Sequence, residues 1–191
     1  SYPVLFILFS WLFMLRFMQR DIVRLPVKKF LPDLALSGLF MGLGIASKWI
    51  GVYSGVGLAV AFFWTIFRHM RMAATSAHLL KTDKSLSDED RKILTLRDQT
   101  TMKRVLVICL WCLLFFVAIP LAIYLLAYIP YFAYAHFDNL KDYLTAVWNA
   151  QLSMFSYHSK PGLGMDHPFY SPWYEWIFNQ RPMYYASPTY V

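Results

Sequence analysis

Charged residues and cysteines are scarce in this chain of 191 residues. Only 15% of the residues are charged and two are cysteines, whereas charged residues make up about 25% of an ordinary soluble domain. So few cysteines exclude a small secreted scaffold held together by several disulfides. The low charge, together with a hydrophobic fraction of 58%, also excludes an intrinsically disordered chain. Because position 1 is Ser within an apolar run, we expect the chain to be a fragment of a larger membrane protein.

Long stretches with little or no charge are the main positive feature of the sequence. They cover residues 2–15, 34–47, 50–67 and 105–135. The second and third are separated only by Lys48 and Trp49. A single helix over 34–67 would be about 51 Å long, well beyond the hydrocarbon core of about 30 Å. We therefore predict a helical hairpin whose tip carries Lys48, Trp49 and Gly51.

The basic residues indicate which side of the membrane each connection occupies. Of the 18 Lys and Arg residues, all lie in or beside the connections 16–29 and 68–104 except Lys48, Lys141, Lys160 and Arg181. Short connections rich in Lys and Arg remain in the cytoplasm, so we place both there and the hairpin tip outside. Membrane orientation thereby explains the net charge of +7, and a nucleic-acid partner has no support.

The resulting prediction is an all-α, polytopic membrane protein. Transmembrane helices are expected at about 2–18, 33–48, 50–67 and 105–129, with cytoplasmic loops at 19–32 and 68–104. We interpret the second loop as a solvated connector in which Ser87, with Asp90 three residues later, caps a short helix. Residues 131–191 are expected to be extracytoplasmic, with an amphipathic helix over 139–157.

Small residues, prolines and cysteines in the apolar stretches bear on packing. Glycines recur at a spacing of four, which lets membrane helices approach closely: Gly38 and Gly42, then Gly51 and Gly55. Pro120 and Pro130 are expected to bend the last transmembrane helix or to mark its end. Cys109 and Cys112 form a Cys-x-x-Cys pattern, but both lie in an apolar span, so neither a redox nor a metal role is predicted.

The segment from residue 157 onward is dense in Trp, Tyr, His and Pro. An aromatic belt at the membrane interface is one explanation. A belt does not require His, Glu and Arg among the rings, however, and aromatic faces beside a few directed polar groups also hold sugars and lipid headgroups. The residues alone leave both explanations open.

Two motifs resemble those of the protein O-mannosyltransferases. Residues 42–53, Gly-Leu-Gly-Ile-Ala-Ser-Lys-Trp-Ile-Gly-Val-Tyr, are similar to the family signature Gly-Leu-Ala-x-x-x-Lys-Trp-x-Gly-x-Tyr. A second set of residues is similar to the stretch that follows the family's seventh membrane helix. It consists of Gln151, Met154, Tyr157-His158, His167-Pro168-Phe169-x-Ser171-x-Trp173-x-x-Trp176 and Arg181-Pro182-x-Tyr184-Tyr185. Residues 2–8 are similar to the helix ahead of the hairpin. The match covers nearly the whole chain. The chain lacks the long soluble insert of the eukaryotic members, and in this respect it resembles a bacterial member of the family.

The resemblance implies a membrane glycosyltransferase of the C-type fold in the bacterial plasma membrane. Such enzymes transfer mannose from a polyprenyl or dolichyl phosphate to Ser or Thr of a translocating protein. The implied partners are the bilayer, the lipid-linked donor, the acceptor protein and the secretion translocon. No cofactor beyond the donor is evident in the sequence, and a requirement for a divalent metal is left open. The family's catalytic Asp-Glu pair has no counterpart here, since neither Asp166 nor Glu175 lies in that motif. We expect that pair upstream of Ser1 and the fragment to be inactive alone.

The candidate residues for binding the donor phosphate or sugar are Lys48, Trp49, Gln151, Tyr157, His158, His167, Ser171, Trp173, Trp176 and Arg181. Lys48 is a lone cation at the outer tip, where a functional role competes with snorkelling into the headgroup region. Arg181 can bind phosphate oxygens in a bidentate manner, or it can pair with Glu175.

The histidines and tryptophans of the aromatic segment have alternative roles as well. His158 and His167 can hydrogen-bond phosphate or sugar hydroxyls, whereas their spacing of nine in a Pro- and Gly-broken stretch is a poor metal signature. Trp173 and Trp176 would share one face of a helical turn, so that one could stack on a sugar and the other anchor in lipid. Structural packing is expected for at least one of the two.

Two other functions remain open. The nearer is a C-type transferase that uses another lipid-linked sugar or an oligosaccharide, because the same residues suit any carrier phosphate. The farther is a transporter or scaffold subunit. A transporter would place charges within several spans and break helices at mid-membrane, whereas only Lys48 is enclosed by apolar sequence here, at a tip.

Overall fold

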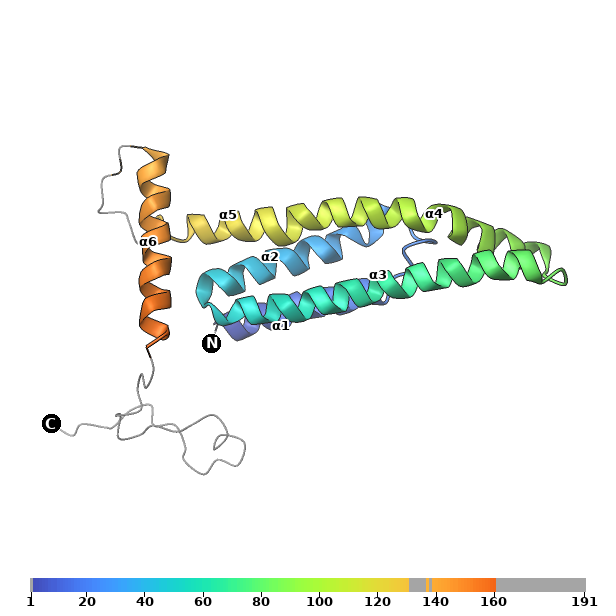
Figure 1. Cartoon of the computed structure of the whole chain (residues 1–191), viewed down its shortest axis with the longest axis horizontal. Helices are drawn as coiled ribbons and strands as arrows, with labels where there is room; N and C mark the ends of the chain where they lie inside the picture. The colour runs from blue at the N-terminus through green and yellow to red at the C-terminus, as the bar shows by residue number, and fades with distance from the viewer. Residues whose placement is uncertain (1, 131–136, 138, 161–191) are drawn as a thin grey trace, which may run out of the picture. The chain divides into compact units, whose positions relative to one another are not determined.

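The computed structural model describes residues 2–130, 137 and 139–160. The chain divides into two units, Ser1–Tyr134 and Ala135–Val191. Regular structure in the described residues is entirely helical, without strands (Figure 1). The predicted all-α class is therefore confirmed for this part of the chain, while the C-type glycosyltransferase arrangement stays a prediction.

Helices of the first unit lie side by side as a bundle (Figure 1). They are α1 (Tyr2–Met18), the 3-10 helix η1 (Val27–Lys29), α2 (Leu31–Ser47), α3 (Ile50–Thr82), α4 (Asp88–Leu113), the π-helical turn η2 (Leu114–Ala118) and α5 (Ile119–Leu126). In the second unit, α6 (Leu140–His158) forms where the amphipathic helix was expected. Asn139 begins α6, because its side-chain oxygen accepts a hydrogen bond of 3.0 Å from the backbone N–H of Asp142.

The predicted break between α2 and α3 is confirmed at Lys48 and Trp49. Lys48 has an extended backbone, with φ −165° and ψ 138°, and its N–H donates to the carbonyl of Gly44, which ends α2. Gly51 packs on the turn before the break: a Cβ atom at this position would lie 2.7 Å from the carbonyl carbon of Gly44. The tight tip therefore requires a residue without a side chain at position 51.

The two helices after the tip are longer than expected. The range 68–104, which we interpreted as a loop, is helical except around residues 83–87. Because no Gly or Pro occurs between Gly57 and Pro120, nothing in the covalent chain interrupts α3 or α4. The predicted cap of α4 is confirmed, since the backbone N–H of Asp90 donates to Ser87 Oγ at 3.1 Å.

The last long helix of the first unit changes its winding ahead of Pro120. A π-helical turn, η2, separates α4 from α5 at this point. Pro120 has no N–H to donate to the preceding turn and its ring crowds that turn, which accounts for the local rewinding. Pro130 follows the end of α5 at Leu126 and lies in the turn over 127–130. The expected bend or end is thus present at both prolines.

Glycines on α2 bring that helix against η2 and α5. A Cβ atom on Gly38 would lie 2.1 Å from the carbonyl oxygen of Phe115, and one on Gly42 would lie 2.9 Å from Cα of Pro120. No side chain fits in either place, so the predicted role of this glycine pair in close helix packing is confirmed.

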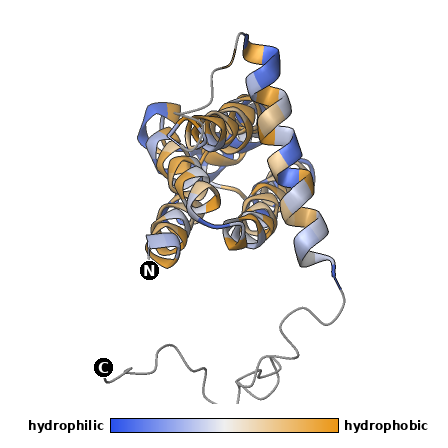
Figure 2. Ribbon diagram, turned by 90° about the vertical axis from the view of Figure 1, so that its left-hand side faces the viewer, coloured by the Kyte–Doolittle hydropathy of each residue, from blue (hydrophilic) through white to orange (hydrophobic). Residues whose placement is uncertain are grey.

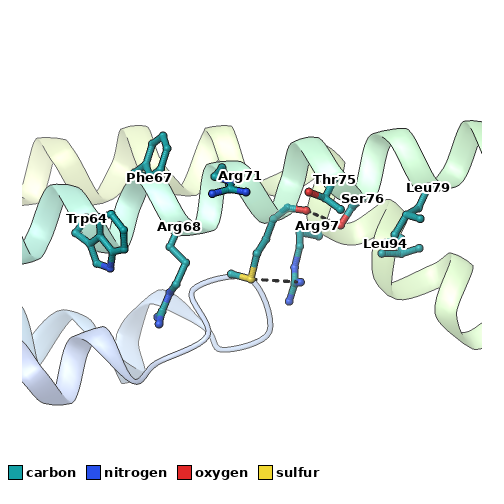
Figure 3. Close-up of a pocket in the computed structure, with 10 residues that line it drawn as sticks. Trp64, Phe67, Arg68, Arg71, Thr75, Ser76, Leu79, Leu94 and Arg97 are labelled. Atoms are coloured by element: carbon teal, nitrogen blue, oxygen red, sulfur yellow. Dashed lines mark hydrogen bonds between the residues drawn. The ribbon is translucent and has the colours of Figure 1, made fainter.

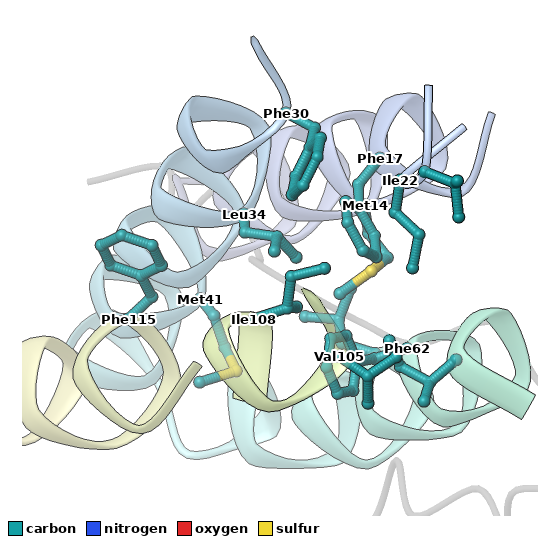
Figure 4. Close-up of a cluster of buried hydrophobic side chains, with 13 residues drawn as sticks. Met14, Phe17, Ile22, Phe30, Leu34, Met41, Phe62, Val105, Ile108 and Phe115 are labelled. Atoms are coloured by element: carbon teal, nitrogen blue, oxygen red, sulfur yellow. The ribbon is translucent and has the colours of Figure 1, made fainter. Parts of the chain in front are cut away.

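Aromatic and aliphatic side chains fill the centre of the bundle (Figure 4). Phe17 of α1 stacks on Phe62 of α3, with ring centroids 6.1 Å apart, and also contacts Phe30 ahead of α2. Farther along the bundle, Ser10 and Ser37 are buried and each donates its hydroxyl to the other's carbonyl, at 3.0 and 2.9 Å. These reciprocal bonds join α1 to α2 without leaving a polar atom unpaired.

Many large apolar side chains are exposed on the outside of the bundle. Examples on three helices are Leu8, Leu12, Val56, Val60, Phe63, Leu106, Leu110 and Leu113. The ribbons of the bundle helices are coloured as hydrophobic over much of their length (Figure 2). Among the described residues, α3 and the continuous helix Asp88–Leu126 are long and apolar enough to cross a membrane, whereas α1 and α2 are shorter apolar helices. Two of the expected spans are thus supported by length and composition, and a four-span topology stays a prediction.

Candidate functional site

The tip of the α2–α3 hairpin lies against the end of α5. The indole Nε1–H of Trp49 donates to the hydroxyl oxygen of Tyr124 at 2.9 Å, although the two residues are 75 positions apart. The Tyr124 hydroxyl lies 3.2 Å from that of Tyr128, and the two rings meet edge to face with centroids 5.5 Å apart. Lys48, Trp49, Tyr124 and Tyr128 form what we call the tip cluster.

Tyr124 and Tyr128 were absent from the residues predicted to form a site. A signal for them exists in the sequence, because tyrosines four residues apart lie on one face of a helix. The predicted topology also returns the last apolar helix to the side where the tip lies. Combining these two facts would have placed both hydroxyls near Trp49, which the motif alone could not do.

Lys48 gives the tip cluster its charge. Its side chain is exposed, and within the described part of the chain the ammonium has no hydrogen-bond or ion-pair partner. Trp49 is 44% exposed beside it. An available cation on the residue before an indole that is bonded to a phenol suits an anionic group attached to a sugar.

Carboxylates lie elsewhere in the described residues of the first unit. Asp21 and Asp33 follow α1, at the end of the bundle away from the tip, and the remaining ones are Asp83, Asp88, Glu89, Asp90 and Asp98 around the α3–α4 connection. The described tip cluster can therefore bind an anion, but it supplies no carboxylate to accept a proton.

Three of the predicted site residues lie on α6 in the second unit. Gln151 and His158 occupy positions about two helical turns apart, and Tyr157 is 55% exposed. The Gln151 side chain donates from Nε2 to the carbonyl of Val147 at 3.3 Å. These residues are presented on one helix, so their spacing along α6 is set by helix geometry.

The remaining predicted site residues fall outside the described part of the chain. They are His167, Ser171, Trp173, Trp176 and Arg181. Asp166 and Glu175 lie outside it as well. The roles inferred for these residues from the sequence stay predictions.

The opposite end of the bundle holds a network of arginines. Asp33, only 5% exposed at its side chain, accepts ion pairs from Arg16 at 3.3 Å and Arg20 at 3.2 Å. Arg104 of α4 donates to the carbonyls of Ile22 and Leu25 in the α1–α2 connection. From the sequence we attributed these arginines to membrane orientation alone, whereas the structure also uses them to hold this connection.

Asp21 in the same connection is kept ionised by its neighbours. Burial by itself would raise the pKa of its carboxyl group, but backbone N–H groups of Val23 and Arg24 and the nearby Arg97 guanidinium hold it below its ordinary value of 3.8. Arg97 reaches Asp21 at 3.3 Å, and Arg24 pairs with it at 3.7 Å. Asp21 therefore links the α1–α2 connection to α4.

No cluster of three His, Cys, Asp or Glu side chains suitable for a metal ion occurs among the described residues. Cys109 and Cys112 are free thiols, and both line an apolar cavity of about 610 Å3 between the helices.

No protein-family model, curated protein or solved structure matches this chain. A functional assignment accordingly depends on its own residues and their geometry.

Proposed function

We propose that the chain is part of a membrane-embedded protein O-mannosyltransferase of the C-type, located in the bacterial plasma membrane. Two observations support the membrane part of the proposal. Two helices have the length and apolar composition of membrane spans, and large apolar side chains cover the outer faces of the bundle. In water such a surface would be an association site, whereas in a bilayer it contacts lipid.

The tip cluster is the single observation that carries the enzymatic proposal. The Lys-Trp dipeptide that resembles the family signature stands at a sharp helix break, with the Lys48 ammonium exposed and the Trp49 indole held by Tyr124. A fixed indole beside an available cation suits a phosphate-linked sugar, because the cation binds the phosphate and the ring faces pack on the sugar.

In this proposal Lys48 binds the donor phosphate and stabilises it as it leaves the sugar. Trp49 and the two tyrosines border the place of the sugar, and the hydroxyl of Tyr124 orients the indole through the bond of 2.9 Å. The residues predicted on α6 and beyond it, from Gln151 to Arg181, stay candidate donor-binding residues from the sequence. The carboxylate that accepts the proton of the acceptor hydroxyl is assigned to none of the described residues.

The identity of the donor is tested by activity. The intact protein should transfer labelled mannose from polyprenyl-phosphate mannose to Ser or Thr of an acceptor peptide. Transfer from another polyprenyl-phosphate sugar, without transfer from the mannose donor, would contradict the mannose assignment and favour the alternative C-type transferase. A protein that binds neither donor would contradict both assignments.

Replacement of Lys48 tests the site itself. Lys48→Ala in the intact protein should weaken use of the donor by about 1.5–3 kcal/mol, or roughly tenfold to a hundredfold in kcat/KM, the range for losing a hydrogen bond to a charged group. Lys141→Ala is the control, because it removes an exposed lysine at the start of α6. Unchanged donor kinetics in a well-expressed Lys48→Ala protein would mean that Lys48 only snorkels into the headgroup region.

A further inference from the structure

A cavity between α3 and α4 gathers three arginines at the end of the apolar part of α3. It measures about 380 Å3, and its lining includes Arg68, Arg71 and Arg97 but no carboxylate (Figure 3). The hydroxyl-bearing residues Thr75 and Ser76 lie on its wall, on the turn after Arg71. Guanidinium charges gathered around one cavity repel one another unless an anion offsets them. Asp21 offsets the charge of Arg97 at 3.3 Å, whereas no carboxylate in the lining offsets those of Arg68 and Arg71.

The three arginines differ in how many hydrogen-bond and ion-pair partners they have within the described part of the protein. Arg68 donates to the carbonyl of Met18 at 2.6 Å, which uses a neutral acceptor and leaves its charge uncompensated. Arg97 pairs with Asp21 at 3.3 Å, yet its buried Nε–H has no acceptor among the described residues. Arg71 is exposed, and no side-chain hydrogen bond or ion pair engages it within the described part of the chain. The cavity thus retains unused guanidinium donors.

The cavity also spans the boundary between apolar and polar surface. Trp64 and Phe67 line it on the side of the apolar stretch, and both are exposed, at 59% and 52%. Their rings are 6.1 Å apart at the centroids. Trp commonly lies at the level of lipid headgroups. A ligand that fits has an anionic head for the arginines and an apolar part for the rings.

We propose that this arginine cavity binds the phosphate of an anionic phospholipid, whose glycerol and upper acyl chains lie against Trp64 and Phe67. The guanidinium groups match phosphate oxygens in shape and charge, which explains why three arginines, and no lysines, line the cavity. The lipid would link α3 to α4 and, through Arg68 and Arg97, to the α1–α2 connection. This proposal does not depend on the enzymatic proposal, because the tip cluster lies at the other end of the bundle.

Native mass spectrometry of the intact protein in neutral detergent tests the proposal. The probes are short-chain phosphatidylglycerol, short-chain phosphatidylcholine and glycerol 3-phosphate, which separate headgroup charge from a free phosphate. We expect phosphatidylglycerol to be retained about tenfold more tightly than either other probe, the effect of one or more charged hydrogen bonds. Equal retention of phosphatidylcholine would overturn the proposal, and equal retention of glycerol 3-phosphate would overturn the lipid assignment in favour of a soluble phosphate.

A pair of arginine variants shows whether the cavity itself is responsible. Arg71→Gln should reduce the affinity for phosphatidylglycerol about tenfold and leave the melting temperature without lipid unchanged, because Arg71 has no partner in the described structure. Arg91→Gln removes the same charge from the exposed first turn of α4, outside the cavity, and should change the affinity less than about twofold. Equal losses in both variants would mean diffuse attraction to basic helices and would overturn the site.

Discussion

Arginine side chains in and beside the α1–α2 connection contribute both positive charge and specific ion pairs. Sequence patterns assign the arginines near it to the cytoplasmic face, which needs only their charge. The structure adds directed bonds: Arg16 and Arg20 to Asp33, and Arg97 to Asp21. A charge that only sets membrane orientation can be moved to a neighbouring position, whereas each of these bonds needs its own pair of residues. A single substitution in one of these pairs should therefore weaken the α1–α2 connection.

Acid should weaken this connection through Asp21. A carboxyl group whose pKa is lowered by folding stabilises the folded state above its ordinary pKa of 3.8, and this contribution disappears as the pH falls through the lower, folded value. At pH 6, Asp21→Asn should therefore be less stable than the unchanged protein by about 1 kcal/mol.

The difference should shrink to near zero as the pH falls well below 3.8. Free energies of unfolding measured in mixed micelles across this range would check it. Asp98→Asn, at an exposed position on α4, is the control and should show little difference at any pH. A gap between Asp21→Asn and the unchanged protein that stayed constant with pH would rule out the ionised carboxylate as its cause.

At the scale of helices, backbone contact sets the packing of α2. Gly38 and Gly42 lie where α2 meets η2 and α5, and Gly51 lies where α3 meets the last turn of α2. Lipid chains are as apolar as leucine, so membrane helices associate by close packing more than by hydrophobic burial. The glycines accordingly mark where α2 comes closest to its neighbouring helices.

Substitution of two glycines on α2 should separate packing from helix propensity. Gly38→Ala should destabilise the protein by about 1–3 kcal/mol through overpacking, because the new methyl group would lie 2.1 Å from the carbonyl oxygen of Phe115. Gly44→Ala is the matched control, since its nearest atom, Cβ of Phe6, is 3.7 Å away. It should leave stability unchanged or raise it by about 0.5–1 kcal/mol through helix propensity. Thermal unfolding in detergent checks both, and equal effects would contradict the contact.

The whole molecule is expected to have one orientation in the membrane. The tip between α2 and α3 carries a single cation, whereas the connections at the other end hold most of the basic residues. In addition, α3 has 33 residues, or about 50 Å, which exceeds the hydrocarbon core by about 20 Å. The polar half of α3 and the first half of α4 should therefore project from the cytoplasmic face as a helical hairpin.

Cysteine labelling in whole cells would check this orientation. In a variant whose Cys109 and Cys112 are replaced by alanine, Ser47→Cys at the exposed tip should react with an impermeant thiol reagent added outside. Ser85→Cys in the α3–α4 connection should react only after the cells are opened. The two changes are chemically identical and both positions are exposed, so they control for each other. The reverse pattern would invert the topology and move the tip cluster to the cytoplasmic side.

Several features of this protein follow from the sequence by itself, because each depends on residues close together in the chain. The break at Lys48 and Trp49 follows from the length of a membrane span, and the cap at Ser87 follows from the hydroxyl and carboxylate three residues apart. The length of α3 and α4 is also local, since an uninterrupted run without Gly or Pro permits it. We underestimated that length by interpreting charge as a sign of a loop.

Tertiary structure alone decided which distant side chains meet. Lys48 and Trp49 were identified from their motif, but Tyr124 became part of the site only when α5 packed beside the tip, 75 residues away. The arginine cavity likewise depends on the rotation of α3 against α4, which a helical pattern does not specify. Pairing, rotation and register of helices result from shape complementarity along their whole length. A local pattern contains only one side of each such contact, and the second side comes from the folded chain.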